Sequence, residues 1–168
     1  MELKIYKYGA SILRRKCKLV KSITTDIEKL IPNMIETMYA DDGIGLSANQ
    51  VGHDISLSII GKDAVESEND LVLINPKILE YSDEKSYEEE GCLSIPDITE
   101  KVSRSKYIKL KYQDLDLKEQ INDFSDFTAR VIQHEVDHLN GVFFTDRISF
   151  LKRKLINKKL KQIAEEYN

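Results

Sequence analysis

The 168-residue sequence contains no tryptophan, only three prolines and two cysteines, and no long apolar run. A bilayer-spanning helix needs about 20 mostly apolar residues and a signal peptide needs a compact apolar core, and the chain offers neither. Cys17 and Cys92 allow at most one disulfide, which an intracellular protein would normally keep reduced. These absences predict a cytoplasmic protein that does not bind membranes.

The charge of the chain is high but nearly balanced. Lysine and arginine number 25 and aspartate and glutamate 29, which gives a formal net charge of −4. Broad affinity for polyanions usually needs an excess of positive charge, so specific DNA binding is not expected. The length and the hydrophobic fraction of 41% fit one globular domain over residues 1–168.

Apolar residues that recur at helical spacing predict a first helix near the N-terminus. Thr25 or Asp26 can cap this helix, and Asp42-Gly43 ends it. Pro32 lies inside the pattern, and we expect it to kink the helix or to shift its start.

Two further helices are predicted in the last third of the chain. Asp126 can cap the first of them, which ends at Gly141, and the second runs from about Ser149. This C-terminal helix is amphipathic. Its Lys-rich face lies opposite an apolar stripe that consists of Leu151, Leu155, Leu160, Ile163 and Ala164.

The middle of the chain predicts strands, since short apolar runs are separated by charged loops. The candidate strands are residues 55–60, 71–81, a stretch leading into Cys92, 107–112 and 120–124. Because these strands do not alternate regularly with helices, the sequence favours an α+β fold over a parallel α/β sheet. We expect mixed or antiparallel strands around the middle helix.

The strongest motif for chemistry lies on that middle helix, in the segment QHEVDH. Two of the three histidines in the chain, His134 and His138, are four residues apart, so they point from one helix face and can bind one metal ion. Glu135 lies beside them and can take a proton from a water molecule at that metal. This spacing favours a metal-binding H-E-x-x-H helix over an ordinary surface or core helix.

A catalytic metal of this type needs a third protein ligand and one open position. No histidine or cysteine follows His138, and Glu165 and Glu166 lie in the last turn of the predicted final helix. Upstream, Cys92 stands in the segment EGCLS at the end of a predicted strand. Cys92 is either a buried structural thiol or the third ligand, and the H-E-x-x-H motif favours the ligand.

A third motif is GIGLSANQ over residues 43–50. The glycines on either side of Ile44 let the backbone approach a ligand closely, and the Gln50 amide can donate a hydrogen bond to an oxyanion. A phosphate loop is not predicted, because no Lys-Ser/Thr pair follows and a helix precedes the motif. Alone the motif says little, since Gly-x-Gly is a frequent turn.

In this order the three motifs resemble the signature of peptide deformylases, GxGxAAxQ, EGCLS and QHExDH. Ser47 is a departure, since it stands where the signature has alanine. The flanking sequence also looks like that family, so the resemblance covers nearly the whole chain. It implies an enzyme that removes the N-formyl group from the formylmethionine of newly made proteins and releases formate.

The resemblance also implies roles for single residues. The metal ligands would be Cys92, His134 and His138. The metal is expected to be Fe(II), which zinc, nickel or cobalt can replace. Glu135 would act as general base and then as general acid. Gln50 and the backbone N–H of Leu93 would stabilise the oxyanion.

Contacts with an N-formylmethionyl nascent peptide are implied for Ile44, Gly45, Glu90, Phe127, Arg130 and Val131. Backbone groups of Ile44 and Gly45 would pair with the peptide like an added strand. The stem of Arg130 would line the pocket wall while its head reaches water.

Two further expectations concern charged residues. Glu90 would pair with Arg104, and Asp137 would orient a metal ligand. The basic C-terminal helix, which resembles that of some family members, would dock on ribosomal RNA.

Two alternatives remain open at this point. A zinc metallopeptidase also uses H-E-x-x-H, but its third ligand lies downstream, where the chain offers only Glu165 or Glu166. A non-catalytic module with structural zinc needs a fourth protein ligand, for which the sequence shows no candidate.

Overall fold

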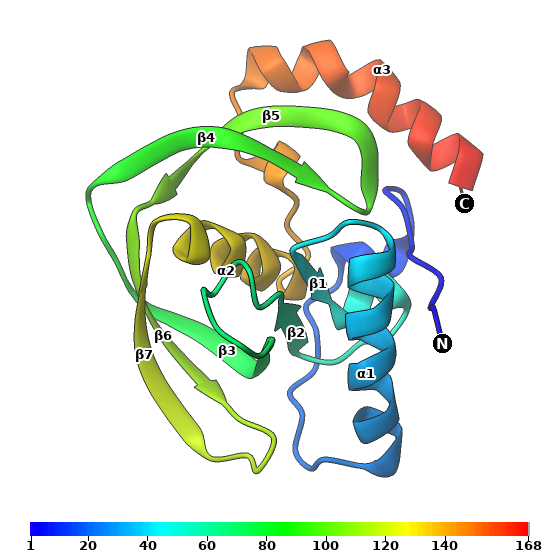
Figure 1. The fold of residues 1–168 in the computed structure, drawn as a ribbon. Coiled ribbons are helices and arrows are strands. Elements are labelled where there is room, and N and C mark those ends of the chain that lie inside the picture. Colours follow the sequence, from blue (N-terminus) through cyan, green and yellow to red (C-terminus); the bar gives the residue numbers. More distant parts are fainter. Residues whose placement is uncertain (168) are drawn as a thin grey trace.

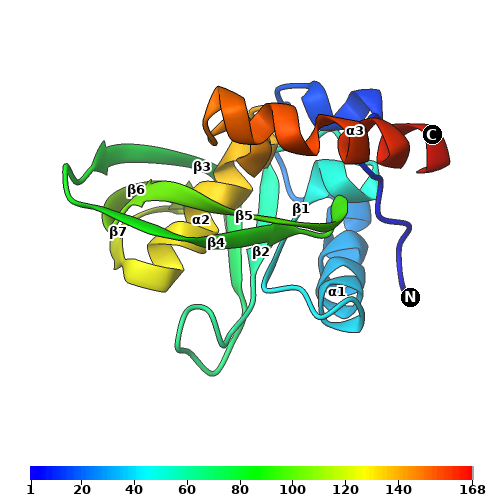
Figure 2. The same ribbon diagram turned by 90° about the horizontal axis from the view of Figure 1, so that it is seen from above.

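The computed structural model describes residues 1–167, and its parts surround one central helix, α2 (Figures 1 and 2). The described helices are α1 (Thr25–Ala40), α2 (Asp126–Leu139) and α3 (Phe150–Tyr167). The strands are β1 (Gly45–Ser47), β2 (Leu57–Ile60), β3 (Leu71–Tyr81), β4 (Lys85–Cys92), β5 (Ile95–Ser105), β6 (Tyr107–Gln113) and β7 (Glu119–Ser125). Short 3-10 turns are η1 (Ser11–Arg14), η2 (Ala48–Val51) and η3 (Phe144–Asp146).

The strands form two antiparallel sheets, which confirms the α+β class. One sheet has the order β1-β2-β3-β6-β7, and β4 pairs with β5 in a second. Helix α2 packs against β1 and β2 of the first sheet and against β5 of the second. In Figure 1 the β4–β5 pair curves over α2, and α3 lies on the outer side of β5.

Two strands, β1 and β5, were not predicted from the sequence, and a third was predicted to begin two residues too early. β1 is only three residues long, and β5 contains Pro96 and several charged residues. The predicted strand at residues 55–60 begins at Leu57 instead, because Ile55 forms an isolated parallel bridge with Lys18.

Helix α1 differs from the prediction at its start. Thr24 is the cap, and its hydroxyl accepts the backbone N–H of Ile27, so neither Thr25 nor Asp26 has that role. The helix begins at Thr25 and continues through Pro32. Pro32 is exposed, so the carbonyl that loses its helical partner there can be solvated.

The caps and faces of the later helices also differ. Asp126 does not cap α2: it is the first helical residue, has a φ of 50°, and donates its N–H to the Lys106 carbonyl. In α3, Leu151 and Leu155 are 68% and 75% exposed. The buried face of α3 consists of Ile156, Leu160 and Ile163.

The central position of α2 has a consequence for its polar side chains. Ten of its 14 residues are buried, and five of those ten are polar or charged: Arg130, Gln133, Glu135, Asp137 and His138. Buried groups of this kind need partners within the protein. No helix among residues 1–167 is long and apolar enough to cross a membrane.

Candidate active site

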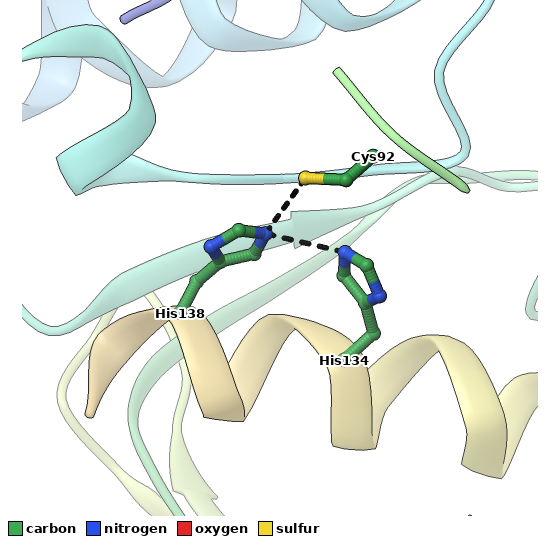
Figure 3. A group of neighbouring side chains, drawn as sticks. All are labelled: Cys92, His134 and His138. Atoms are coloured by element: carbon green, nitrogen blue, oxygen red, sulfur yellow. Dashed lines mark hydrogen bonds between the residues drawn. The ribbon is translucent and has the colours of Figure 1, made fainter. Parts of the chain in front are cut away.

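Cys92 meets the two histidines of α2 in one cluster (Figure 3). Cys92 is the last residue of β4, while His134 and His138 are one helical turn apart. The His138 Nε2 atom lies 3.2 Å from Cys92 Sγ and 3.2 Å from His134 Nε2. One thiol and two imidazoles at this separation can together bind a divalent metal ion.

The surroundings of His134 fit a cation at the centre of this cluster. Its Nδ1 donates to Glu90 Oε1 at 2.9 Å, so Nε2 is the nitrogen that faces Cys92 and His138. Burial lowers the pKa of His134, but hydrogen bonds with Cys92 and Glu90 outweigh it and raise the pKa to about 10. The site therefore favours positive charge at Nε2, which a proton or a metal ion can supply.

His138 is held more deeply and stays neutral. Burial and the neighbouring His134 lower the pKa of His138 well below its usual value. Its Nδ1 atom is buried and has no hydrogen-bond partner within residues 1–167. Its backbone carbonyl accepts a hydrogen bond from Asn49 Nδ2 at 2.7 Å, which ties α2 to η2.

A buried ion-pair network stands behind His134. Arg104 donates from Nε and one terminal nitrogen to both oxygens of Glu90, each at 2.9 Å. Burial raises the pKa of Glu90, but hydrogen bonds from Arg104 and His134 outweigh it and leave the carboxyl ionised, with a pKa far below its usual value. The expected Glu90–Arg104 pair is present, and Asp137 touches it by accepting from Arg104 at 2.5 Å. Asp137 is thus linked to His134 through Arg104 and Glu90.

The guanidinium of Arg130 does not reach solvent, so the prediction that it would do so is wrong. The residue is only 4% exposed. Its guanidinium donates to Glu90 Oε2 at 2.6 Å, to the Val102 carbonyl at 2.9 Å and to the Ser86 hydroxyl and carbonyl at 2.9 and 3.0 Å. The β4–β5 pair covers this side of α2, so the guanidinium binds protein acceptors instead of solvent.

Glu135 follows His134 on α2 and lines the same cleft. Its side chain is buried, and Oε2 accepts a hydrogen bond from Ser47 Oγ at 2.6 Å. Burial raises the pKa of Glu135 and outweighs the opposing effects of His134 and Ser47. A carboxylate whose pKa is raised in this way is a better proton acceptor than an ordinary surface glutamate.

Gln50 and Leu93 lie on the β1 and β4 sides of the cluster. The Gln50 Nε2 amide contacts Ser94 Oγ at 3.1 Å and Cys92 Sγ at 3.7 Å. Leu93 follows Cys92, and its carbonyl accepts from Lys7 Nζ at 2.8 Å. Lys7 also lines the cleft, but no sequence motif pointed to it.

The cleft is a cavity of about 540 Å³. Eleven of the twelve site residues named from the sequence line it, and His138 is the exception because it lies deeper. Ile44 and Phe127 are 48% and 54% exposed at its mouth, whereas Gly45 and Val131 are buried. An extended peptide can therefore reach Cys92 and His134 from solvent.

The comparisons with known proteins agree with this geometry. A sequence model of the family described as polypeptide deformylase matches residues 2–154. The chain belongs to this family. A peptide deformylase of Prosthecochloris aestuarii is 44% identical over 169 residues, which cover 98% of this chain and 89% of that protein.

Solved structures of peptide deformylases are similar as well. The crystal structure of the Thermotoga maritima enzyme is 41% identical, covers 89% of this chain and 99% of its own, and has a TM-score of 0.83. The Thermus thermophilus structure is 32% identical, covers 99% of both chains and has a TM-score of 0.90.

Membership of the peptide deformylase family settles the class of the protein. The family consists of metal-dependent hydrolases that remove N-formyl groups from nascent peptides, so the chain is an enzyme. The zinc metallopeptidase alternative is not favoured.

Proposed function

We propose that the chain, as one catalytic domain over residues 1–168, removes the formyl group from N-formylmethionyl peptides with a divalent metal bound by Cys92, His134 and His138. The observation that carries the proposal is the convergence of these three donors in one cluster, of which Cys92 and His134 line the open cleft together with Glu135. The H-E-x-x-H helix α2 is then the metal-binding element around which the fold is built.

The residues of the cleft supply the remaining chemistry. When bound, the metal would polarise the formyl carbonyl and lower the pKa of the attacking water. Glu135 takes a proton from that water as it adds to the formyl carbon, and returns the proton to the amine as the C–N bond breaks. Gln50 Nε2 and the backbone N–H of Leu93 donate to the carbonyl oxygen as it becomes negative. The products are formate and a free amino terminus.

The substrate is held on both sides of the cluster. Backbone groups of Ile44 and Gly45 pair with the extended peptide, and Phe127 and Val131 of α2 form the apolar wall for the methionine side chain. Arg130 contributes only its stem to that wall, since its guanidinium is bound to protein acceptors.

Substitutions test the division of labour. Cys92→Ala, His134→Ala and His138→Ala are expected to lose both bound metal and formate release from a formylmethionyl peptide. Glu135→Gln is expected to keep the metal and lose about 10²-fold or more in turnover, because coordination stays while the base is removed. Cys17→Ala is the matched control, since it removes a buried thiol outside the cleft. Stoichiometric metal in Cys92→Ala would remove Cys92 from the ligand set.

Fe(II) is the metal we propose for the enzyme in the cell, with zinc, nickel or cobalt as replacements. One thiolate, two imidazoles and an open position suit any of these ions. Elemental analysis of protein purified without oxygen identifies the ion. In air, the iron form is expected to lose activity faster than the nickel form, because iron and Cys92 are both oxidisable.

We also propose that α3 docks on ribosomal RNA. Lys154, Lys158 and Lys161 are exposed, and the segment from residue 149 to the C-terminus has six basic and two acidic residues, a net charge of +4. Reversal of the three lysines to glutamate should weaken ribosome binding at low salt and leave hydrolysis of a small formyl peptide unchanged. The same reversal at Lys21, Lys29 and Lys62, which are exposed elsewhere, is the control. Equal binding by both variants would leave α3 a structural element.

The cytoplasmic location stays a prediction.

A further inference from the structure

Ser47 of β1 is fully buried and points at the carboxylate of Glu135. Its Oγ atom lies 2.6 Å from Glu135 Oε2 and 3.1 Å from the Glu135 carbonyl. A third oxygen, Ser58 Oγ on β2, is 2.8 Å from Ser47 Oγ. Ser47 and Ser58 are direct partners in the antiparallel β1–β2 ladder, so the sheet register fixes the two hydroxyls side by side.

The direction of these hydrogen bonds follows from counting protons. In the ionised form that a general base requires, the Glu135 carboxylate only accepts, so Ser47 donates its single hydroxyl proton to Oε2 in the short contact. Ser47 Oγ then has only lone pairs left, and Ser58 is the donor to it. The result is a short chain of donors from Ser58 through Ser47 to Glu135.

The opposite oxygen of Glu135 is fixed by shape. Gly45 precedes Ser47 by two residues, so both lie on the same face of β1. A Cβ atom at Gly45 would lie 2.6 Å from Glu135 Oε1, which means that the carboxylate rests directly against the glycine backbone. Ser47 N in turn donates to Gln50 Oε1 at 2.9 Å, which holds β1 in place. The carboxylate therefore sits between Gly45 and the Ser47 hydroxyl.

We propose that Ser47, supported by Ser58, is a positioning residue for Glu135 in the deformylation reaction. The inference rests on the proposed function, in which Glu135 moves the proton between water and the leaving amine. A carboxylate with one oxygen held by a charge-assisted hydrogen bond has fewer rotamers, so Oε1 stays in place beside Gly45 at the wall of the cleft. The loss of such a bond costs turnover but not substrate binding, because Ser47 does not line the cleft.

The test uses nickel-loaded enzyme and formate release from a formylmethionyl peptide. Ser47→Ala is expected to lower kcat about five- to tenfold with unchanged KM and metal content, and Ser58→Ala about two- to threefold. Ser47→Thr keeps the hydroxyl and should restore kcat to within about twofold of wild type. Ser105→Ala is the matched control, because it removes another buried serine hydroxyl, one that donates to the Ser82 carbonyl away from the cleft.

A second readout does not depend on turnover. The infrared carboxylate band of Glu135, identified as the band that Glu135→Gln removes, should shift in Ser47→Ala and stay in place in Ser47→Thr and Ser105→Ala. Unchanged kcat and an unmoved band in Ser47→Ala would overturn the positioning role. Lower kcat with an unmoved band, or without rescue by threonine, would overturn it too, since simple packing loss explains both.

The two hypotheses fail separately. Full activity of Glu135→Gln would remove the proposed general base itself. An inactive Glu135→Gln together with a fully active Ser47→Ala would leave the base in place and overturn only the role of Ser47.

Discussion

At the scale of single residues, two buried arginines share one carboxylate behind the cluster of Cys92, His134 and His138. Arg104 binds both oxygens of Glu90, and Arg130 binds one of them from the other side. All three side chains are less than 10% exposed, so each charge depends on its partners for compensation. Glu90 in turn fixes the orientation of the His134 ring, because Oε1 accepts a hydrogen bond from the Nδ1–H of the histidine.

The sequence identified most of these residues but not all of their contacts. The spacing of His134 and His138 implies a shared helix face, and it drew attention to Glu135 and Cys92. The environment of Arg130 could not be predicted, because the strand pair that covers it is contributed by residues 85–105. The role of Ser47 was missed for a similar reason, since its partner Ser58 becomes a neighbour only through the register of β1 and β2.

The first prediction concerns Arg130. Arg130→Met removes a buried cation that four acceptor atoms share, and we expect it to lower the free energy of unfolding by about 3 kcal/mol. Arg130→Lys should lose less, yet still more than about 1 kcal/mol, because one ammonium cannot reach all of these acceptors. The measurement is guanidinium unfolding of the metal-loaded protein.

Lys109→Met is the control for Arg130→Met, since it breaks the exposed pair with Glu80 and should cost under about 1 kcal/mol. If Arg130→Met and Lys109→Met were equally stable, the buried network would contribute nothing to folding.

At the scale of secondary structure, periodicity located elements better than it assigned their faces. The predicted strand over residues 71–81 matches β3, and the apolar residues that gave the pattern of α1 are buried except for Ile35, which is partly buried. On α3, however, Leu155 is exposed while its neighbour Ile156 is buried. Both leucines and isoleucines fit a helical stripe, and only the position of β5 beneath the helix decides which of them is covered.

The second prediction concerns Gly141, which lies two residues beyond the end of α2. This glycine has a φ of 73°, and a Cβ atom there would lie 2.5 Å from the Arg14 carbonyl oxygen. Gly141→Ala combines a left-handed backbone with a clash against rigid main chain, so we expect a loss of more than about 2 kcal/mol in the free energy of unfolding.

Gly91→Ala is the matched control, because its added Cβ atom would meet Thr99 Cγ2 at an ordinary 3.4 Å. Unfolding by urea, followed by circular dichroism, compares the two variants. Similar stability for both would show that the contact between η1 and the end of α2 yields easily.

At the scale of the whole molecule, the site depends on contacts between distant segments that local sequence patterns do not predict. Three motifs that begin at residues 43, 90 and 133 come from β1, β4 and α2, and they line one cleft. The strand order β1-β2-β3-β6-β7 places the β4–β5 pair outside the main sheet, where it can cover α2. Motif order indicated the chemistry, whereas this arrangement follows from long-range pairing that local patterns do not contain.

The N-terminal segment, η3 and α3 are joined by one carboxylate, Asp146. It accepts hydrogen bonds from Arg14 at 2.5 Å, from Arg153 at 2.7 Å and from the Phe143 N–H at 2.8 Å. Burial raises the pKa of Asp146, but the hydrogen bonds from Arg14, Phe143 and Arg153 outweigh it, and the pKa is lowered. Asp146 therefore links parts of the molecule that are more than 100 residues apart in sequence.

The last prediction uses this shift in pKa. A carboxyl whose pKa is lower in the folded state stabilises the fold above its unfolded pKa, about 3.9 for aspartate, and loses that contribution as the pH falls further. Asp146→Asn should lower the free energy of unfolding at pH 7 by about 1 kcal/mol, a value reduced for the partial exposure of Arg14. The deficit should shrink as the pH falls below about 4, where wild type loses the same charge. Loss of metal on acidification affects both proteins alike and cancels in their difference.

Asp116→Asn, in an exposed turn, is the control and should show no such pH-dependent difference. A deficit in Asp146→Asn that stays constant between pH 3 and pH 7 would mean that the ionised carboxylate is not what holds these segments together.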